Sequence, residues 1–324
     1  MKTEIVSASA ADAVSRAVDL LREGEAVALP TETVYGLAAD ALRAEAVLKI
    51  FEAKSRPRFD PLIVHLPDED WIDRVAIVDR SIRPLFDRLH NQFWPGPLTF
   101  VFPRQPVISD VVTAGLETVA IRLSAHLVFR KIIAEFGRPL AAPSANRFGR
   151  ISPTAAAHVA DELNGLIPLI VDGGPTLHGL ESTIVALRNG RIEVLRRGPV
   201  TEERLAEFGE VEVIGPTVHP EAPGQLPSHY APRTPLILVD DPASFVCAPG
   251  QRCGLLAWKR PELDQFAAVR RLSKRQDLVE AATNLFRYLR ELDNQNLDLI
   301  VAAKVPDHGL GAAINDRLHR ASAR

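Results

Sequence analysis

A proline-rich segment in the second half of the chain constrains the fold more than any other sequence feature. Six prolines fall within the twenty residues from Pro216 to Pro235. A stretch this rich in proline is stiff and extended and forms little regular structure, which is typical of a linker. The 324 residues suffice for two hydrophobic cores. We therefore predict two domains, residues 1–209 and 236–324, joined by a linker at residues 210–235.

Short apolar runs alternate with helical periods on both sides of this linker. Ala26–Leu29 and Leu62–Leu66 are strand candidates, whereas Arg43–Lys54 gathers its apolar residues on one face, as a helix does. Asn189-Gly190 separates two further apolar runs and is a strong signal for an antiparallel hairpin. The pattern predicts an α/β domain with a mixed sheet before the linker and a smaller α/β domain after it.

Composition excludes several classes of protein. The residues are 46% apolar and 24% charged, with a net charge of −3. This composition disfavours a protein that coats nucleic acid non-specifically, but it is compatible with a local basic cleft. The two cysteines, Cys247 and Cys253, are too few for a disulfide framework and wrongly spaced for a usual zinc site. No signal-peptide core or membrane-spanning run is present, and we expect a cytoplasmic protein without a membrane partner.

The stretch from Pro139 to Thr154 holds small polar and basic residues between an apolar run and a helical pattern. Ser152 is expected to cap a helix over 155–163, with Pro153 at its first position. A helix N-terminus presents free N–H groups and a favourable dipole to an anion. An ordinary capped helix after a polar loop would have the same sequence, so the stretch alone does not establish a site.

Cations and hydroxyls dominate the ends of the apolar elements in the first domain, and few of these positions are acidic. They are Thr31, Thr33, Tyr35, Lys54, Arg56, Arg58, His65, Thr118, Arg122, Ser144, Asn146, Ser152, Ser182, Thr183, Arg196 and Arg197. Arginine forks match phosphate and carboxylate groups, and hydroxyls complete such a cradle. If these residues converge, they suit a polyanion or a carboxylate better than a sugar or a metal.

Several of these residues also have a purely structural interpretation. Lys54 and Arg56 suit a helix C-terminus, and His65 taken alone suits a structural histidine. Arg122 lies inside an apolar strand pattern, where it needs a partner, so a functional role is favoured. Arg196 and Arg197 alternate faces of a strand, so at most one of them faces a given site.

A set of short motifs in a fixed order resembles the threonylcarbamoyl-AMP synthase family in its longer, two-domain form. The motifs are Pro30-Thr-Glu-Thr-Val-Tyr-Gly-Leu37, Lys54-Ser-Arg-Pro57, Pro61-Leu-Ile-Val-His65, Trp94-Pro-Gly-Pro-Leu-Thr99, Val119-Ala-Ile-Arg122, Pro143-Ser-Ala-Asn146, Ser152-Pro-Thr154, Asp172-Gly-Gly-Pro175, Gly179-Leu-Glu-Ser-Thr-Ile-Val185, Leu195-Arg-Arg-Gly198, Ser228-His-Tyr-Ala-Pro232 and Gly309-Leu-Gly-Ala-Ala-Ile-Asn-Asp-Arg-Leu318. The resemblance implies a YrdC-like twisted mixed sheet with helices around a basic cleft, followed by a smaller Rossmann-like α/β domain.

The resemblance also implies an activity. The family is a nucleotidyltransferase that makes threonylcarbamoyl-AMP and pyrophosphate from L-threonine, bicarbonate or CO2, and ATP. Other enzymes then pass the threonylcarbamoyl group to the tRNA adenosine next to the anticodon. The implied partners are therefore these substrates and the downstream transfer enzymes, and a possible contact with RNA is left open. A magnesium ion, held mainly by the nucleotide, is also implied, and no protein ligand for it is assigned.

Roles of individual residues follow from the resemblance. The implied catalytic residues are Lys54, Arg56, Ser144 and Asn146. The implied threonine-binding residues are Thr33, His65, Arg122, Ala142 and Ser182, with Arg122 as the partner of the carboxylate. The implied ATP-binding residues are Arg56, Asp60, Thr118, Ser144, Ser152, Arg196 and Tyr230, and Tyr230 in the linker is expected to close over the nucleotide.

Two residues depart from the family pattern. Asp60 stands where asparagine is common, and its carboxylate would repel phosphate unless Arg56 or Arg58 pairs with it. Phe148 stands where a small residue is usual. Two other classes remain as alternatives: a non-catalytic RNA-binding protein, disfavoured because the sequence has no basic stripe or aromatic platform, and a carbamoyl-phosphate-using hydrogenase maturation protein, disfavoured because its cysteine-rich motifs are missing.

Overall fold

The computed structural model describes residues 2–215, 221–223, 225–226, 228–259 and 264–323. These residues form two compact units. The first comprises Met1–Phe148, Pro153–Leu177 and Glu181–Leu226, and the second comprises Gly149–Ser152, His178–Leu180 and Pro227–Arg324. None of the described helices is long and apolar enough to cross a membrane.

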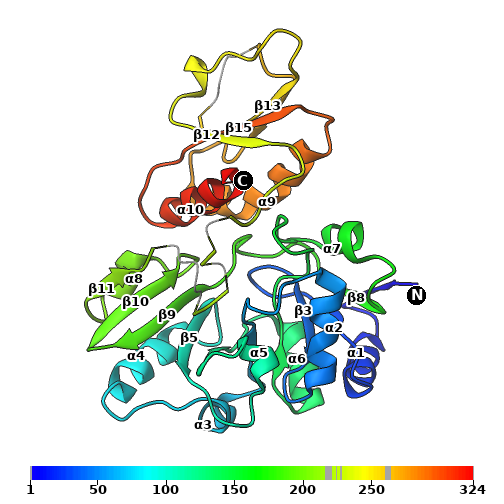
Figure 1. Cartoon of the computed structure of the whole chain (residues 1–324), viewed down its shortest axis with the longest axis vertical. Coiled ribbons are helices and arrows are strands. Elements are labelled where there is room, and N and C mark those ends of the chain that lie inside the picture. Colours follow the sequence, from blue (N-terminus) through cyan, green and yellow to red (C-terminus); the bar gives the residue numbers. More distant parts are fainter. Residues whose placement is uncertain (1, 216–220, 224, 227, 260–263, 324) are drawn as a thin grey trace. The chain divides into compact units, whose positions relative to one another are not determined.

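The first unit is built on one large sheet (Figure 1). Its strands are β1 (Glu4–Ser7), β2 (Val27–Leu29), β3 (Gly36–Asp40), β4 (Ile63–His65), β5 (Leu98–Pro103), β6 (Thr118–Arg122), β7 (Leu140–Ala141), β8 (Leu169–Asp172), β9 (Thr183–Arg188), β10 (Arg191–Arg196) and β11 (Val211–Val213). Its helices are α1 (Ala13–Arg22), α2 (Ala44–Lys54), the 3-10 turn η1 (Glu69–Trp71), α3 (Ile72–Val75), α4 (Arg83–Phe93), α5 (Asp110–Thr113), α6 (Leu127–Phe136), α7 (Ala156–Leu163) and α8 (Glu202–Ala206).

Strand pairing in this sheet mixes both directions, as predicted. The order is β1-β8-β2-β3-β7-β4-β6-β5-β9-β10-β11. β4 and β6 run parallel, whereas β7 pairs antiparallel with both β3 and β4. β9 and β10 form the predicted antiparallel hairpin around Asn189 and Gly190, both of which have positive φ. Such a turn matches the right-handed twist of the flanking strands.

Both faces of the sheet are covered around β2. Val27 and Leu29 pack in a cluster with residues of α1 and α6, whereas Ala28, between them, packs with residues of α2 and α7 on the opposite face. Alternate residues of a strand point to opposite faces, so a strand that is covered on both sides is apolar throughout. This double coverage explains why Ala26–Leu29 reads as a continuous apolar run.

The second unit contains a separate parallel sheet with the order β12-β15-β13-β14. Its elements are β12 (Leu236–Val239), η2 (Pro242–Ser244), β13 (Cys253–Ala257), β14 (Ala268–Arg271), α9 (Leu278–Asp293), β15 (Leu299–Ala303) and α10 (Leu310–Ser322). Asp277 caps α9 by accepting hydrogen bonds from the N–H groups of Val279 and Glu280. The small α/β fold predicted after the linker is confirmed.

Two local features differ from the sequence predictions. Helix α7 begins at Ala156 with Ala155 in the N-cap position, so Ser152 does not cap it. Strand β3 was not predicted, because its residues Gly-Leu-Ala-Ala-Asp lack the β-branched and aromatic side chains that mark strands. All five are buried, so tertiary packing decides their conformation.

Candidate functional site

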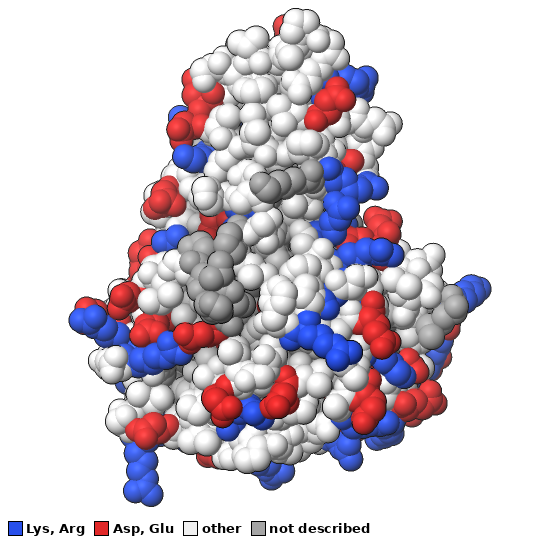
Figure 2. Space-filling view, viewed as in Figure 1, with Lys and Arg blue, Asp and Glu red and all other residues white. Residues whose placement is uncertain are grey.

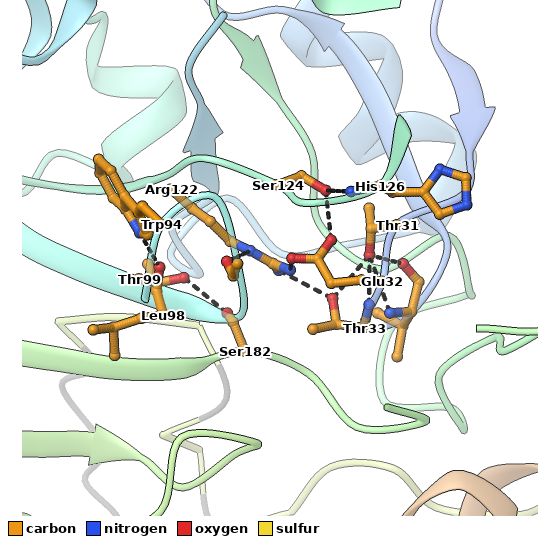
Figure 3. A network of polar contacts seen from close by, with 12 residues as sticks. Thr31, Glu32, Thr33, Trp94, Leu98, Thr99, Arg122, Ser124, His126 and Ser182 are labelled. Carbon is orange, nitrogen blue, oxygen red and sulfur yellow. Dashed lines mark hydrogen bonds and ion pairs between the residues drawn. The ribbon is translucent and has the colours of Figure 1, made fainter. Parts of the chain in front are cut away.

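The loop that follows β2 presents two threonine hydroxyls (Figure 3). The Thr31 hydroxyl donates to the carbonyl oxygen of Val34 at 2.6 Å and accepts from the N–H groups of Thr33 and Val34. The Thr31 and Thr33 oxygens lie 2.8 Å apart. Since the single Thr31 proton is used on Val34, Thr33 donates to Thr31, and the Thr33 oxygen can itself accept hydrogen bonds. The local backbone therefore orients the Thr33 hydroxyl.

Arg122, at the end of β6, is the centre of a buried polar network (Figure 3). Its Nε donates to the Gly96 carbonyl at 3.1 Å and its Nη1 to the Thr33 hydroxyl at 3.0 Å. Its Nη2 donates to Glu32 Oε1 at 2.5 Å, and Ser124 donates to Glu32 Oε2 at 2.5 Å. The partner that an arginine in an apolar strand requires is thus a glutamate.

The Glu32 carboxylate stays ionised in this setting. Burial by itself would raise the pKa of Glu32, but the charge of Arg122 and the hydrogen bonds from Ser124 and Arg122 outweigh it and lower the pKa to about 2. Glu32 and Arg122 are only 5% and 3% exposed. A charge pair that is withdrawn from water this completely fixes the position of both side chains.

His65 lies beside Arg122 because β4 and β6 are parallel and place the two residues in register. Its ring packs against Phe129 with the centroids 4.8 Å apart. Burial and the nearby Arg122 charge lower the pKa of His65 to about 3, so the imidazole is neutral. Within the part of the chain that the structure describes, His65 Nδ1 has no hydrogen-bond partner.

Ser182 connects two parts of the site. Its hydroxyl lies 2.8 Å from the hydroxyl of Thr99 and accepts a hydrogen bond from Arg196 Nη2 at 3.0 Å. Arg196 Nε also donates to the Ser182 carbonyl at 3.0 Å. Its neighbour Arg197 is half-buried and pairs with Glu202 instead. As the alternation of strand faces predicts, only one of the two arginines joins Ser182.

Lys54, at the end of α2, reaches into the Pro139–Thr154 stretch. Its Nζ donates to the carbonyl of Ser144 at 2.6 Å and to the carbonyl of Asn146. Burial and the Arg56 charge lower the pKa of Lys54 well below its usual value. The loop is fixed further by the N–H of Phe148, which donates to the Lys54 carbonyl at 2.9 Å. The four predicted catalytic residues therefore come from two neighbouring segments.

Asp60 pairs with Arg56 rather than with the exposed Arg58. Arg56 Nη2 lies 2.9 Å from Asp60 Oδ2, and Arg56 also donates to the carbonyls of Asp60 and Pro61. Burial raises the pKa of Asp60, although the charges of Arg56, Lys54 and Arg196 oppose the shift. The Arg56 guanidinium lies 6.0 Å from the centroid of the Phe148 ring. Both departures from the family pattern thus contact the same arginine.

The other predicted site residues belong to the following elements and units. Thr118 begins β6, the strand that ends at Arg122, and four strand residues span roughly 13 Å. Ala142 follows β7, and its N–H donates to the Ile63 carbonyl at 2.9 Å. Ser152 and Tyr230 belong to the second compact unit. There the buried Tyr230, with a φ of 65°, stacks on Phe286.

Sequence reasoning missed Glu32, Ser124 and Thr99, which complete the networks around Arg122 and Ser182. Signals for Glu32 existed, because a glutamate between two threonines follows a buried strand, and because Arg122 required an anionic partner. Ser124 and Thr99 carry no comparable signal, since single hydroxyls are common near strand ends.

Comparisons with known proteins agree with this architecture. Residues 19–198 match the Sua5/YciO/YrdC family, described as "Telomere recombination". Residues 200–323 match the C-terminal domain of threonylcarbamoyl-AMP synthase. The threonylcarbamoyl-AMP synthases of Pyrococcus abyssi and Bacillus subtilis are both 40% identical to the chain. The matches cover 94% and 95% of this chain and 93% and 92% of those proteins, respectively.

A solved structure shows the same fold. The crystal structure of P. abyssi Sua5 in complex with L-threonine superposes with a TM-score of 0.90 at 36% identity, over 99% of this chain and 98% of that one. The chain therefore belongs to the threonylcarbamoyl-AMP synthase family, in its two-domain form. It is an enzyme, and its reaction is the synthesis of threonylcarbamoyl-AMP for the threonylcarbamoyladenosine modification of tRNA.

Proposed function

We propose that the network around Arg122 is the L-threonine subsite of this enzyme. The observation that carries the proposal is the placement of Arg122, a buried cation fixed in register with the neutral His65 and bonded to the Thr33 hydroxyl. Arg122 binds the substrate carboxylate, while Thr33, His65, Ala142 and Ser182 contact the rest of the amino acid. The related P. abyssi protein was crystallised with L-threonine, which supports this assignment.

The ATP subsite, in this proposal, adjoins the threonine subsite through Ser182. Arg196 donates a hydrogen bond to Ser182. An arginine that suits a phosphate group therefore contacts one of the proposed threonine-binding residues. The ATP-binding residues are Arg56, Thr118, Ser144, Ser152, Arg196 and Tyr230, and Asp60 borders the subsite through its ion pair with Arg56 rather than as a ligand of the phosphates. Lys54, Arg56, Ser144 and Asn146 surround the reacting groups, where their charges and dipoles stabilise the negative charge that develops.

Two steps complete the reaction. The threonine amine attacks CO2 and loses a proton, which gives a carbamate; bicarbonate gives the same product with loss of water. A carbamate oxygen then attacks the α-phosphorus of ATP, and pyrophosphate leaves. Neither step needs a protein nucleophile, because both depend on positioning and charge stabilisation. Lys54, whose side chain two backbone carbonyls hold in place, suits this role.

The described residues contain no group of three or more histidine, cysteine, aspartate or glutamate side chains that could hold a metal ion. In our proposal, magnesium enters with the ATP phosphates, which it binds readily. We further assign the catalytic domain to residues 1–209, the linker to 210–235 and the second domain to 236–324. Residues 216–220, 224 and 227 of this linker lie outside the described part of the chain.

The cellular setting completes the proposal. The protein acts in the cytoplasm, and enzymes that transfer the threonylcarbamoyl group to tRNA receive its product. Figure 2 shows lysine and arginine together with aspartate and glutamate on the face in view. The net charge of −3 favours an enzyme that hands on a small molecule over a protein that coats RNA.

Separate binding measurements test the two subsites. Calorimetric titration of the Arg122→Ala protein with L-threonine should show a loss of affinity of about 10- to 100-fold, the range of a lost charge-assisted hydrogen bond. Its ATP affinity should stay close to the wild-type value. The Lys54→Ala protein should still bind threonine but release no pyrophosphate. Unchanged threonine affinity in Arg122→Ala would exclude the proposed carboxylate contact.

A further inference from the structure

Glu32 is the one acidic side chain that contacts Arg122 among the described residues. Both oxygens of its carboxylate accept hydrogen bonds, one from Arg122 and one from Ser124 (Figure 3). Ser124 also uses its oxygen to accept the N–H of His126 at 3.3 Å. The carboxylate is therefore held from the segment that follows β6 as well as by Arg122 itself.

The guanidinium of Arg122 is held on three sides. It has five N–H groups, and three of them donate hydrogen bonds, one each to Gly96, Thr33 and Glu32. Two N–H groups, one on Nη1 and one on Nη2, remain for a substrate. A carboxylate accepts two parallel N–H bonds from such a fork only when the plane of the guanidinium is fixed.

Of the three holding contacts, the one to Glu32 is the strongest, because it joins opposite charges away from water. Gly96 offers a backbone carbonyl and Thr33 a hydroxyl, which are neutral acceptors. Without Glu32 the guanidinium would also be a buried cation without a counter-charge. The guanidinium would then turn toward other acceptors or water, and its two remaining N–H groups would no longer face the substrate carboxylate.

We infer that Glu32 is a positioning residue for the threonine subsite: through its contact with Arg122 it sets the orientation in which Arg122 takes the substrate carboxylate. This inference rests on the proposed role of Arg122. It assigns to Glu32 no contact with the substrate and no proton transfer. The Thr33 hydroxyl depends on the same contact, since Arg122 donates to it.

Glu32→Gln is the first test, because glutamine keeps the shape and one acceptor oxygen but removes the charge. The KM for threonine should rise about 10-fold, and Glu32→Ala should raise it further, toward about 100-fold. The KM for ATP and the kcat should change less than about 3-fold in Glu32→Gln. Ser124→Ala, which removes the other hydrogen bond but leaves the charge, is the matched control and should have a smaller effect than Glu32→Gln.

A double-mutant cycle with Arg122→Lys tests whether Glu32 acts through Arg122. In the Arg122→Lys background, Glu32→Gln should change the threonine KM by less than about 2-fold, because the fork that Glu32 orients is gone. Independent, multiplicative effects of the two substitutions would overturn the inference. An unchanged threonine KM in Arg122→Lys alone would overturn the proposed carboxylate contact and this inference together.

Inhibition by (R)-3-hydroxybutanoate, which is threonine without its amino group, separates positioning from direct contact with the substrate nitrogen. If Glu32 orients Arg122, Glu32→Gln weakens this inhibitor and threonine by the same factor, because both use the carboxylate. Weaker threonine binding with unchanged inhibitor binding would show a contact between Glu32 and the amine, and would overturn the inference. A wild-type threonine KM in Glu32→Gln would overturn it while the role of Arg122 stands.

Discussion

Asp60→Asn is the substitution whose effect can be worked out most fully from the structure. Asp60 is fully buried and lies 2.9 Å from Arg56, an arginine assigned here to the ATP phosphates. Asparagine has nearly the same shape and leaves the Asp60 backbone carbonyl, to which Arg56 Nε donates at 3.2 Å, in place. The substitution therefore removes one negative charge beside the phosphates, while the hydrogen bonds of Arg56 to the carbonyls of Asp60 and Pro61 keep the guanidinium in place.

The magnitude follows from the repulsion between this carboxylate and ATP. Two like charges about 6 Å apart repel by roughly 3 kcal/mol at an effective dielectric constant of about 20. Lys54, Arg56 and Arg196 all act on Asp60 and offset part of this repulsion. A net gain of about 1–2 kcal/mol on substitution is therefore expected, so that Asp60→Asn binds ATP about 5- to 30-fold more tightly.

Calorimetric titration with ATP measures this change in affinity directly, with Arg58→Gln as a control that removes an exposed charge nearby.

The pH dependence of the stability of the fold gives a second test. Because burial raises the pKa of Asp60 above the unfolded value of 3.8, the folded state binds the proton more tightly. Stability is thus lost as pH rises through the folded pKa, and Asp60→Asn should lack this loss. Weaker ATP binding by Asp60→Asn would refute the argument and make Asp60 a direct ligand.

Two further predictions concern His65 and the second domain. The pKa of His65 is about 3 in the folded protein and 6.5 when unfolded, so between these values only the unfolded state binds its proton. Stability therefore rises with pH across this window, by at most about 1.4 kcal/mol per pH unit. Urea unfolding of His65→Gln should show a shallower rise between pH 4 and 6.5, and an unchanged slope would contradict the assigned pKa. A chain of residues 1–215 should fold, with the circular dichroism of an α/β protein, but should make threonylcarbamoyl-AMP weakly or not at all. Unchanged kinetics in this truncated chain would exclude a role for Tyr230 as a cover of the nucleotide.

The sequence predicted the features that depend on periodicity or on turn chemistry. Both α/β folds and the Asn189-Gly190 hairpin are present, because each follows from local pattern. Strand β3 was missed, since its five residues include no β-branched or aromatic side chain and their conformation comes from packing between β2 and β7. Ser152 was wrongly predicted as a helix cap, because the helix begins four residues later, at Ala156.

In the site too, local motifs could be predicted from the sequence, whereas contacts set by the tertiary fold could not. Lys54, Ser144 and Asn146 come together, as the ordered motifs imply. The motifs do not show which groups hold the cations in place. The Asp60–Arg56 pair and the Glu32–Arg122 pair each join residues whose side-chain directions depend on the tertiary fold. Contacts between residues 90 positions apart, as for Glu32 and Arg122, are beyond what periodicity in one sequence can reveal.

The most direct test of the proposed site and reaction is pyrophosphate release measured with one substrate omitted at a time. The purified protein should release pyrophosphate from ATP only when L-threonine and bicarbonate are both present, and Lys54→Ala should release none under the same conditions. Pyrophosphate release that does not depend on threonine, or full activity in Lys54→Ala, would contradict the account.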